Sequence, residues 1–174
     1  QGGVVSPVLS NLFLHYVFDK WMGRNYVQNP FCRYADDAIA HCRSEAEALE
    51  LKEALDARFR ECGLKLHPEK TKIVYCKDGN RQCRYKNEQF DFLGYTFRAR
   101  KVKAKSGKYF VGFTPAISRK SREGIGEKIR EWKLSKWSSC TIEEMAERLN
   151  PAIRGWINYY GKFCPSALFP IYHQ

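Results

Sequence analysis

Apolar residues recur at helical spacing near the start of the chain. They lie three or four positions apart: Leu9, Leu12, Phe13, Tyr16 and Val17. Ser6 and Pro7 precede them, a pair typical of a helix start because the first turn leaves backbone N–H groups unpaired, which serine can cap and proline lacks. The pattern predicts an amphipathic helix over residues 6–23.

Two short strand-like runs follow at residues 31–35 and 38–42, and Asp36 and Asp37 lie between them. Short runs joined by turn-forming residues predict a tight hairpin. Ser44 and Glu47 are spaced as in a capping box, so a second helix is predicted from there to Gly63.

Further strands are predicted at residues 72–76, 90–98 and 109–113, with a polar loop at 77–87 and a turn at Ser106-Gly107. Residues 118–134 predict a basic amphipathic helix, although two glycines inside it lower the helix propensity.

Two more helices are predicted near the end. Thr141 and Glu144 form a capping box for a helix reaching residue 149, and Asn150-Pro151 predicts the start of a last helix ending at residue 161. We therefore predict an α+β fold in two parts. Residues 1–114 are expected to form the α+β part, and residues 115–174 a small helical part.

The charge is concentrated in one segment. The 174 residues carry a formal net charge of +11, and residues 98–136 contribute thirteen basic against three acidic side chains. Tyr109, Phe110, Phe113, Trp132 and Trp137 are interleaved with these charges. Aromatic side chains among cations favour a surface that follows a phosphate backbone, so nucleic acid is the expected partner.

Cysteine usage and hydropathy exclude other classes. The seven cysteines include no CxxC pair, which argues against a disulfide framework or a structural zinc site. We expect an intracellular reducing compartment, either a bacterial-type cytoplasm or an organelle. Polar residues interrupt the most apolar stretch, residues 4–18, so no membrane partner is expected.

Asp36 and Asp37 are the main candidates for chemistry. Aspartate is a common turn residue, so a purely structural role for the pair stays open. Carboxylate oxygens are also the ligands that Mg²⁺ prefers, and polymerase chemistry uses two such ions, with a third ligand from elsewhere.

Four blocks resemble the palm of a reverse transcriptase, in the same order. They are QGGVVSPVLSNLFL at 1–14, YADD at 34–37, GLKLHPEKTKIV at 63–74 and FDFLGYTF at 90–97. Each block alone is a weak signal, but the shared order and gaps are specific.

Two downstream blocks resemble the thumb, or maturase domain X, of group II intron-encoded reverse transcriptases. They are TPAISRKS at 114–121 and NPAIRGWINYYG at 150–161. The resemblance implies a partial reverse-transcriptase palm at 1–114, an antiparallel sheet with packed helices, followed by a small α-helical thumb, or truncated maturase domain X, at 115–174.

The resemblance assigns roles around the YADD block. It implies that Asp36 is a metal ligand and Asp37 its catalytic neighbour, with Tyr34 and Ala35 near the primer end. The cofactor implied is Mg²⁺, as two ions in the full-length enzyme.

Other blocks carry further implied roles. Gln1 and Gly2 match a pair that lines the incoming nucleotide, and Lys70 matches a lysine near the pyrophosphate, although an ordinary exposed lysine fits the same letters. Leu93 and Gly94 match the primer-gripping turn, and their neighbours also fit a core strand.

The basic segment and the last helix supply the expected RNA contacts. In the last helix the apolar spacing places Trp156 in the core and leaves Arg154 for RNA. The predicted RNA-binding residues are Arg98, Arg100, Lys101, Lys103, Lys105, Lys108, Arg119, Lys120, Arg122 and Arg154.

The expected function is RNA-directed DNA synthesis by a group II intron protein that also assists splicing. Its partners would be group II intron RNA, an RNA template with a DNA primer, and dNTPs. The resemblance begins within the palm, so the fingers and the first catalytic aspartate would precede Gln1. We therefore expect this chain alone to be inactive.

Two alternatives stay open. One is a non-catalytic splicing factor that binds intron RNA through a palm kept as scaffold, although an intact YADD argues against it. The other is a retron-type or other bacterial reverse transcriptase, which the RGWINYYG block at 154–161 disfavours.

Overall fold

The first helical run is continuous but changes its winding. The computed structural model, which describes residues 3–80, 84–104 and 106–172, contains α1 (Ser6–Leu14), the π-helical turn η1 (His15–Asp19) and α2 (Lys20–Asn25). The predicted helix over 6–23 is confirmed, although Val5 rather than Ser6 occupies the cap position. Residues 6–13 of α1 are exposed and Leu14 is half-buried, and the first buried residues of the run are Val17 and Phe18.

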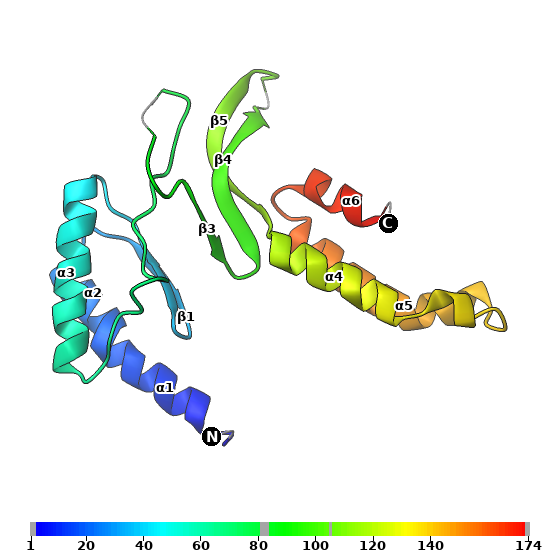
Figure 1. Ribbon diagram of the computed structural model, residues 1–174, viewed down its shortest axis with the longest axis horizontal. Helices are drawn as coiled ribbons and strands as arrows, with labels where there is room; N and C mark the ends of the chain where they lie inside the picture. The colour runs from blue at the N-terminus through cyan, green and yellow to red at the C-terminus, as the bar shows by residue number, and fades with distance from the viewer. Residues whose placement is uncertain (1–2, 81–83, 105, 173–174) are drawn as a thin grey trace. The chain divides into compact units, whose positions relative to one another are not determined.

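A hairpin and a long helix complete the first part of the fold (Figure 1). Strands β1 (Phe31–Tyr34) and β2 (Asp37–Ala40) pair antiparallel, and α3 (Glu45–Glu61) follows them. The core joins Phe18, Met22 and Leu51, with the Phe31 and Phe59 rings edge-on to Phe18. The two predicted strands and the helix are therefore confirmed.

The start of α3 differs in detail from a capping box. Ser44 Oγ accepts the backbone N–H of Glu47 at 3.2 Å, as predicted. In a capping box the glutamate carboxylate accepts the backbone N–H of the cap residue, here Ser44. The Glu47 carboxylate also accepts hydrogen bonds from the Arg43 backbone N–H and from Asn29 Nδ2. Asn29 is buried, so this side chain ties the helix start to the hairpin.

The second part of the fold begins with a three-stranded antiparallel sheet of order β3-β4-β5. Its strands are β3 (Gln89–Phe92), β4 (Tyr95–Lys103) and β5 (Tyr109–Ile117). Tyr95 pairs with Phe92 on one side and with Ile117 on the other. The long β4–β5 pair ends at the predicted turn, where Gly107 has a positive φ of 83°.

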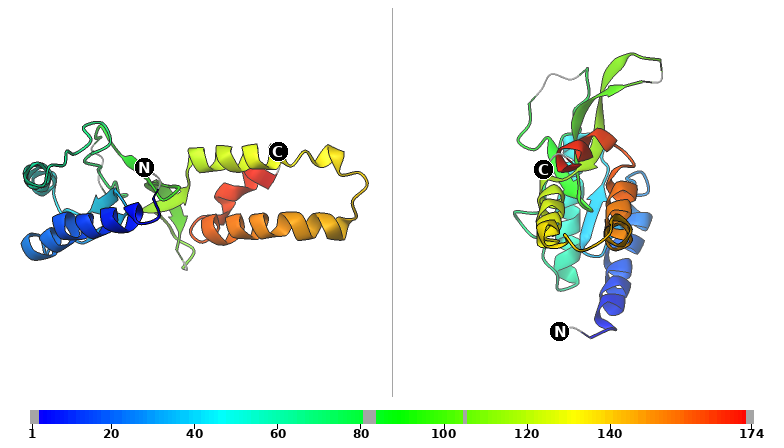
Figure 2. Two further views of the ribbon diagram at one scale, coloured as in Figure 1. Left: turned by 90° about the horizontal axis from the view of Figure 1, so that it is seen from below. Right: turned by 90° about the vertical axis from the view of Figure 1, so that its right-hand side faces the viewer.

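The helices that follow the sheet share a core with its last strand, β5. They are α4 (Arg119–Glu131), the short 3-10 turn η2 (Leu134–Lys136), α5 (Ile142–Tyr160), η3 (Pro165–Leu168) and α6 (Phe169–Tyr172). Figure 2 shows α4 and α5 running side by side, with η3 and α6 between them. Ile117, Ile125, Leu168 and Ile171 form the core here, and Trp156 packs against it as predicted.

Three predictions about elements are wrong. Residues 72–76 form no strand, although the Tyr75 N–H donates to the Asn87 carbonyl at 2.9 Å. The capping box at Thr141 is present, but the helix does not end at residue 149, because α5 continues through Pro151. Residues 90–98 are not one strand, because the Leu93-Gly94 turn divides them between β3 and β4. The predicted basic helix, in contrast, is confirmed as α4, and its two glycines do not interrupt it.

The chain divides into two compact units, Gln1–Ile73 and Val74–Gln174, here called the N-terminal and C-terminal units. The α+β class and the antiparallel sheet are confirmed. The predicted division at residue 114 falls inside β5, and as a boundary between palm and thumb it stays a prediction. No helix in residues 3–80, 84–104 and 106–172 is long and apolar enough to cross a membrane.

Candidate active site and nucleic-acid interface

The YADD block lies at the tip of the β1–β2 hairpin. Tyr34 pairs with Asp37, so Ala35 and Asp36 form a two-residue loop. Ala35 has a positive φ of 53°, a conformation that costs a residue with a Cβ about 1–2 kcal/mol. The side chains of Tyr34, Asp36 and Asp37 are exposed. The hairpin tip thus presents two adjacent carboxylates to solvent, Asp36 in the loop and Asp37 at the start of β2.

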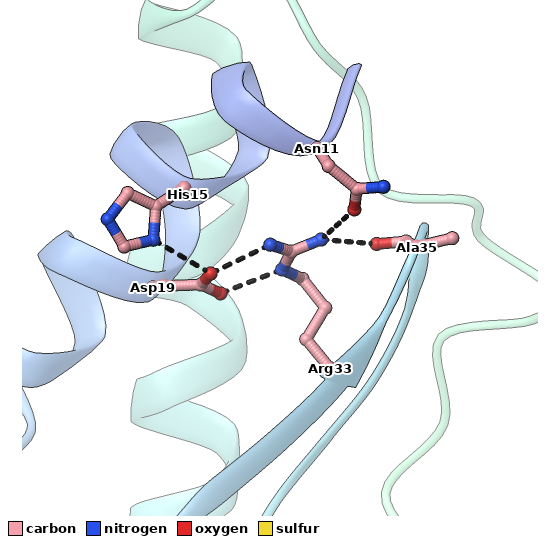
Figure 3. Close-up of polar contacts among 5 residues, drawn as sticks. All are labelled: Asn11, His15, Asp19, Arg33 and Ala35. Atoms are coloured by element: carbon pink, nitrogen blue, oxygen red, sulfur yellow. Dashed lines mark hydrogen bonds and ion pairs between the residues drawn. The ribbon is translucent and has the colours of Figure 1, made fainter. Parts of the chain in front are cut away.

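Arg33 anchors this tip to the first helical run (Figure 3). Its guanidinium donates from Nε and Nη2 to the two oxygens of Asp19, each at 2.7 Å. Its Nη1 donates to Asn11 Oδ1 at 3.0 Å and to the Ala35 carbonyl at 2.7 Å. One side chain therefore joins α1, η1 and the loop that carries the carboxylates.

The electrostatics of the anchor favour its charged form. The hydrogen bond from Arg33 lowers the pKa of Asp19, and the hydrogen bond to Asp19 raises the pKa of Arg33. His15 Nδ1 lies 3.2 Å from Asp19 Oδ2 and contributes to the lowering. The Arg33 side chain is only 12% exposed, so water screens this bidentate pair weakly.

Sequence reasoning missed this anchor. The sequence patterns described above assign no role to either Asp19 or Arg33. A signal exists in the strand alternation, because Phe31 and Arg33 point to the same face of β1 and Phe31 packs on the core. A charged side chain on the buried face of a strand is costly unless it is paired, so the position of Arg33 predicts an acidic partner.

The carboxylate pair fits a divalent cation in part. Within residues 3–80, 84–104 and 106–172, neither the Asp36 nor the Asp37 carboxylate forms a hydrogen bond or ion pair, so four hard oxygens are open to a ligand. Two carboxylates suit Mg²⁺, which keeps several waters or phosphate oxygens. The same described part of the chain holds no group of three metal-ligating side chains.

The structure says little about the roles of three other predicted site residues. Lys70 is exposed in an irregular segment, and its backbone N–H donates to His67 Nδ1 at 3.4 Å. No contact among the described residues joins Lys70 to the carboxylates. Gln1 and Gly2 lie outside the described residues.

The Leu93-Gly94 turn lies between β3 and β4, and side chains and backbone groups of α4 and α5 donate hydrogen bonds to it. Both residues have positive φ, 50° and 77°. The Gly94 carbonyl accepts the Ser118 N–H at 2.9 Å and Ser121 Oγ at 3.1 Å, both at the start of α4. From α5, the Tyr159 hydroxyl donates to the Leu93 carbonyl at 2.9 Å.

Glycine at position 94 is required by space as well as by backbone conformation. A Cβ there would lie 2.9 Å from Ser121 Oγ and 3.0 Å from the Tyr160 hydroxyl oxygen. The neighbouring Tyr95 is buried, and its hydroxyl donates to the Tyr159 carbonyl. The turn is thus seated on α4 and α5, and its backbone has little freedom.

The β4–β5 pair presents cations around an exposed aromatic ring. Lys101 and Lys103 Nζ lie 4.9 and 5.9 Å from the centre of the Tyr109 ring, which is 61% exposed. The three side chains share one face, because Lys103 pairs with Tyr109 in the register. Such a cluster can contact a phosphate backbone while the ring stacks on a base.

The remaining predicted RNA-binding residues differ in their freedom. Arg100 is half-buried and donates to the carbonyls of Thr114 and Thr96, and burial lowers its pKa. Arg119 is exposed but pairs with Glu123 at 2.7 Å. Lys105 lies outside the described residues. The other five are exposed: Arg98, Lys108, Lys120, Arg122 and Arg154.

Two segments of the chain match known protein families. Residues 1–97 match the reverse transcriptase (RNA-dependent DNA polymerase) family. Residues 123–174 match the group II intron maturase-specific domain. No curated protein matches the chain. The first match covers more than half of the chain, including the hairpin with its two carboxylates and the Leu93-Gly94 turn. The chain therefore belongs to the reverse transcriptase family, and with its maturase-specific segment it is a group II intron reverse transcriptase/maturase.

Proposed function

We propose that Asp36 and Asp37 hold the catalytic metal ions of RNA-directed DNA synthesis. The observation that carries this proposal is a pair of exposed carboxylates, with no partner among the described residues, on a hairpin tip anchored by Arg33. The family implies divalent cations, and Mg²⁺ bound there would lower the pKa of the attacking hydroxyl and stabilise the leaving pyrophosphate. A further carboxylate from another strand would complete the ligand set.

The reaction places simple demands on the residues of this chain. The primer 3′-oxygen attacks the α-phosphorus of a dNTP, a P–O bond forms, and the bond to pyrophosphate breaks. Asp36 and Asp37 supply negative charge where cations must gather, and Arg33 keeps their loop in position through the Ala35 carbonyl. Leu93 and Gly94 would contact the primer backbone through a turn that α4 and α5 hold in place. Lys70 would meet the pyrophosphate.

Asp36→Asn tests the metal assignment in the protein that contains this chain. The amide keeps the size of the side chain but removes its charge, so primer extension on an RNA template should fall at least about 100-fold, as for loss of a transition-state electrostatic contact. Asp56→Asn is the matched control, because Asp56 lies on α3 in a surface pair with Arg60. Extension that persists in Asp36→Asn would remove the carboxylates from catalysis.

We propose that the exposed cations of β4 and β5 and the maturase-specific helices bind template-primer and intron RNA, the latter in splicing. Lys101→Gln with Lys103→Gln should weaken RNA binding and lower the slope of log K against log salt by about 1.4, since each single-strand phosphate contact contributes about 0.7. Lys52→Gln with Lys65→Gln is the control, because it removes the same charge from exposed positions that carry no proposed RNA contact. Equal slopes in the two variants would place the RNA surface elsewhere.

The same two assays separate the catalytic proposal from its alternative. A non-catalytic splicing factor would show RNA binding that depends on Lys101 and Lys103, splicing assistance, and no extension sensitive to Asp36. A polymerase with maturase activity loses extension alone when Asp36 is replaced.

A further inference from the structure

A second cationic site lies in the N-terminal unit and uses none of the residues assigned above. A groove is lined by side chains of η1, α2 and α3: Tyr16, Lys20, Trp21, Arg24, Asn25 and Arg58. Every charged residue of this lining is a cation. The N-terminal unit as a whole carries ten basic and ten acidic residues, so the local excess does not follow from its composition.

Helical geometry aligns the cations. Tyr16, Lys20 and Arg24 follow one another at intervals of four along a continuous helical run, which places them in one stripe about 12 Å long at 1.5 Å per residue. Arg58 approaches the same run from α3, where its Nε donates to the Val17 carbonyl at 3.4 Å. Two elements distant in sequence thus contribute to one groove.

The cations of the stripe are free to bind an anion. Lys20 and Arg24 are exposed and form no ion pair within the described part of the chain. Arg58 pairs with Glu61 at 3.3 Å, but Glu61 is 67% exposed, and an exposed pair of this kind contributes at most about 1 kcal/mol. A phosphate can therefore replace it at little cost.

The aromatic residues give the groove a second property. Tyr16 is 61% exposed beside the cations. Trp21 is half-buried, packs on the Phe18–Met22 core and lies 5.1 Å from the Tyr26 ring, so its position is held. Cations beside exposed and rigid rings suit unpaired nucleotides, whose bases stack while their phosphates follow the charge.

We propose that this groove binds a single-stranded segment of RNA, with Lys20, Arg24 and Arg58 on phosphates and Tyr16 and Trp21 against bases. The family membership implies nucleic-acid binding, but the groove lies in none of the blocks that carry the catalytic residues or the basic segment. It would give the protein an RNA contact independent of Asp36, Asp37 and residues 98–136.

The test measures binding of a fluorescein-labelled 12-nucleotide oligouridylate to the full chain by fluorescence polarisation at several salt concentrations. Lys20→Gln with Arg24→Gln should lower the slope of log K against log salt by about 1.4. Lys52→Gln with Lys65→Gln removes the same charge from exposed positions outside the groove and should leave the slope unchanged. Equal slopes in the two double variants would overturn the proposal.

A crosslinking experiment locates the contact. An oligonucleotide containing 4-thiouridine, irradiated with the full chain, should yield peptides crosslinked at Tyr16 or Trp21, and Lys20→Gln with Arg24→Gln should reduce them. Crosslinks confined to residues 98–136 would refute the site. Weaker binding of the groove variant to vesicles of anionic lipid, with RNA binding unchanged, would assign the groove to a membrane surface and refute it as well.

Discussion

The Leu93-Gly94 turn offers a sharp test of how the C-terminal unit is built. Gly94→Ala adds one methyl group at a position with φ of 77°, where the left-handed conformation costs about 1–2 kcal/mol. The new Cβ would also lie 2.9 Å from Ser121 Oγ and 3.0 Å from the Tyr160 hydroxyl oxygen. Neither neighbour moves freely, because Ser121 Oγ donates to the Gly94 carbonyl and Tyr160 packs on the core.

Displacing such packed groups costs about 1–3 kcal/mol. Together with the backbone cost, Gly94→Ala should lower the free energy of unfolding of the C-terminal unit by about 2–5 kcal/mol. Gly107→Ala is the matched control. Its φ is 83°, and its Cβ would meet nothing within 4 Å, so it bears the backbone cost alone.

Urea unfolding followed by tryptophan fluorescence measures the difference, since Trp132 and Trp156 stack between α4 and α5. With a slope near 2 kcal/mol per molar urea, the midpoint of Gly94→Ala should lie about 0.5–1.5 M below that of Gly107→Ala. The loss of chain entropy in the unfolded state is the same for both variants and cancels. Equal midpoints would show that the contacts of Ser121 and Tyr160 do not constrain the turn.

Three further predictions concern the other constraints. Arg33 lowers the pKa of Asp19, so their pair stabilises the fold above the ordinary pKa of aspartate and loses this effect as the pH falls through the lowered value. Arg33→Met should therefore lower the free energy of unfolding by about 1–3 kcal/mol at pH 7 and by little in strong acid. The control Arg24→Met should change it little at either pH. Urea titrations in which the loss for Arg33→Met did not depend on pH would contradict the pairing. Tyr159→Phe removes the donor to the Leu93 carbonyl and should lower the free energy of unfolding by about 0.5–1.5 kcal/mol in the same assay. Tyr109→Phe is the control and should leave it unchanged. Equal urea midpoints for the two variants would count against that hydrogen bond. Pro151→Ala restores a backbone donor inside α5, where proline costs up to about 3 kcal/mol relative to alanine, so thermal melting by circular dichroism should occur at a higher temperature; a lower one would mean that α5 needs the proline.

Features that depend on neighbours in sequence were predictable. The capping box at Thr141 and Glu144 forms as expected, with hydrogen bonds of 3.0 and 3.2 Å. The hairpin around Ala35-Asp36 and the turn at Gly107 form as well. Each needs only side chains and backbone groups within a few positions, so local chemistry decides them.

Features that need distant partners were not predictable in the same way. Residues 72–76 have the composition of a strand, but a strand exists only where another strand pairs with it, and they form none. Pro151 usually marks a helix start, yet α5 continues through it, and its side chains Trp156 and Tyr160 pack on a core built from β5, α4, η3 and α6. Packing in the tertiary structure outweighs a local preference of a few kcal/mol.

The sequence by itself determined the family, the α+β class, the position of the two aspartates at a hairpin tip and the concentration of charge in residues 98–136. Only the tertiary structure decided what holds that tip, because Arg33 and Asp19 lie fourteen positions apart and meet across a helix and a strand. It also decided that α4 and α5 seat the Leu93-Gly94 turn, and that Arg58 joins Lys20 and Arg24 in one groove. These contacts depend on the folded path of the chain, which brings side chains far apart in sequence within bonding distance.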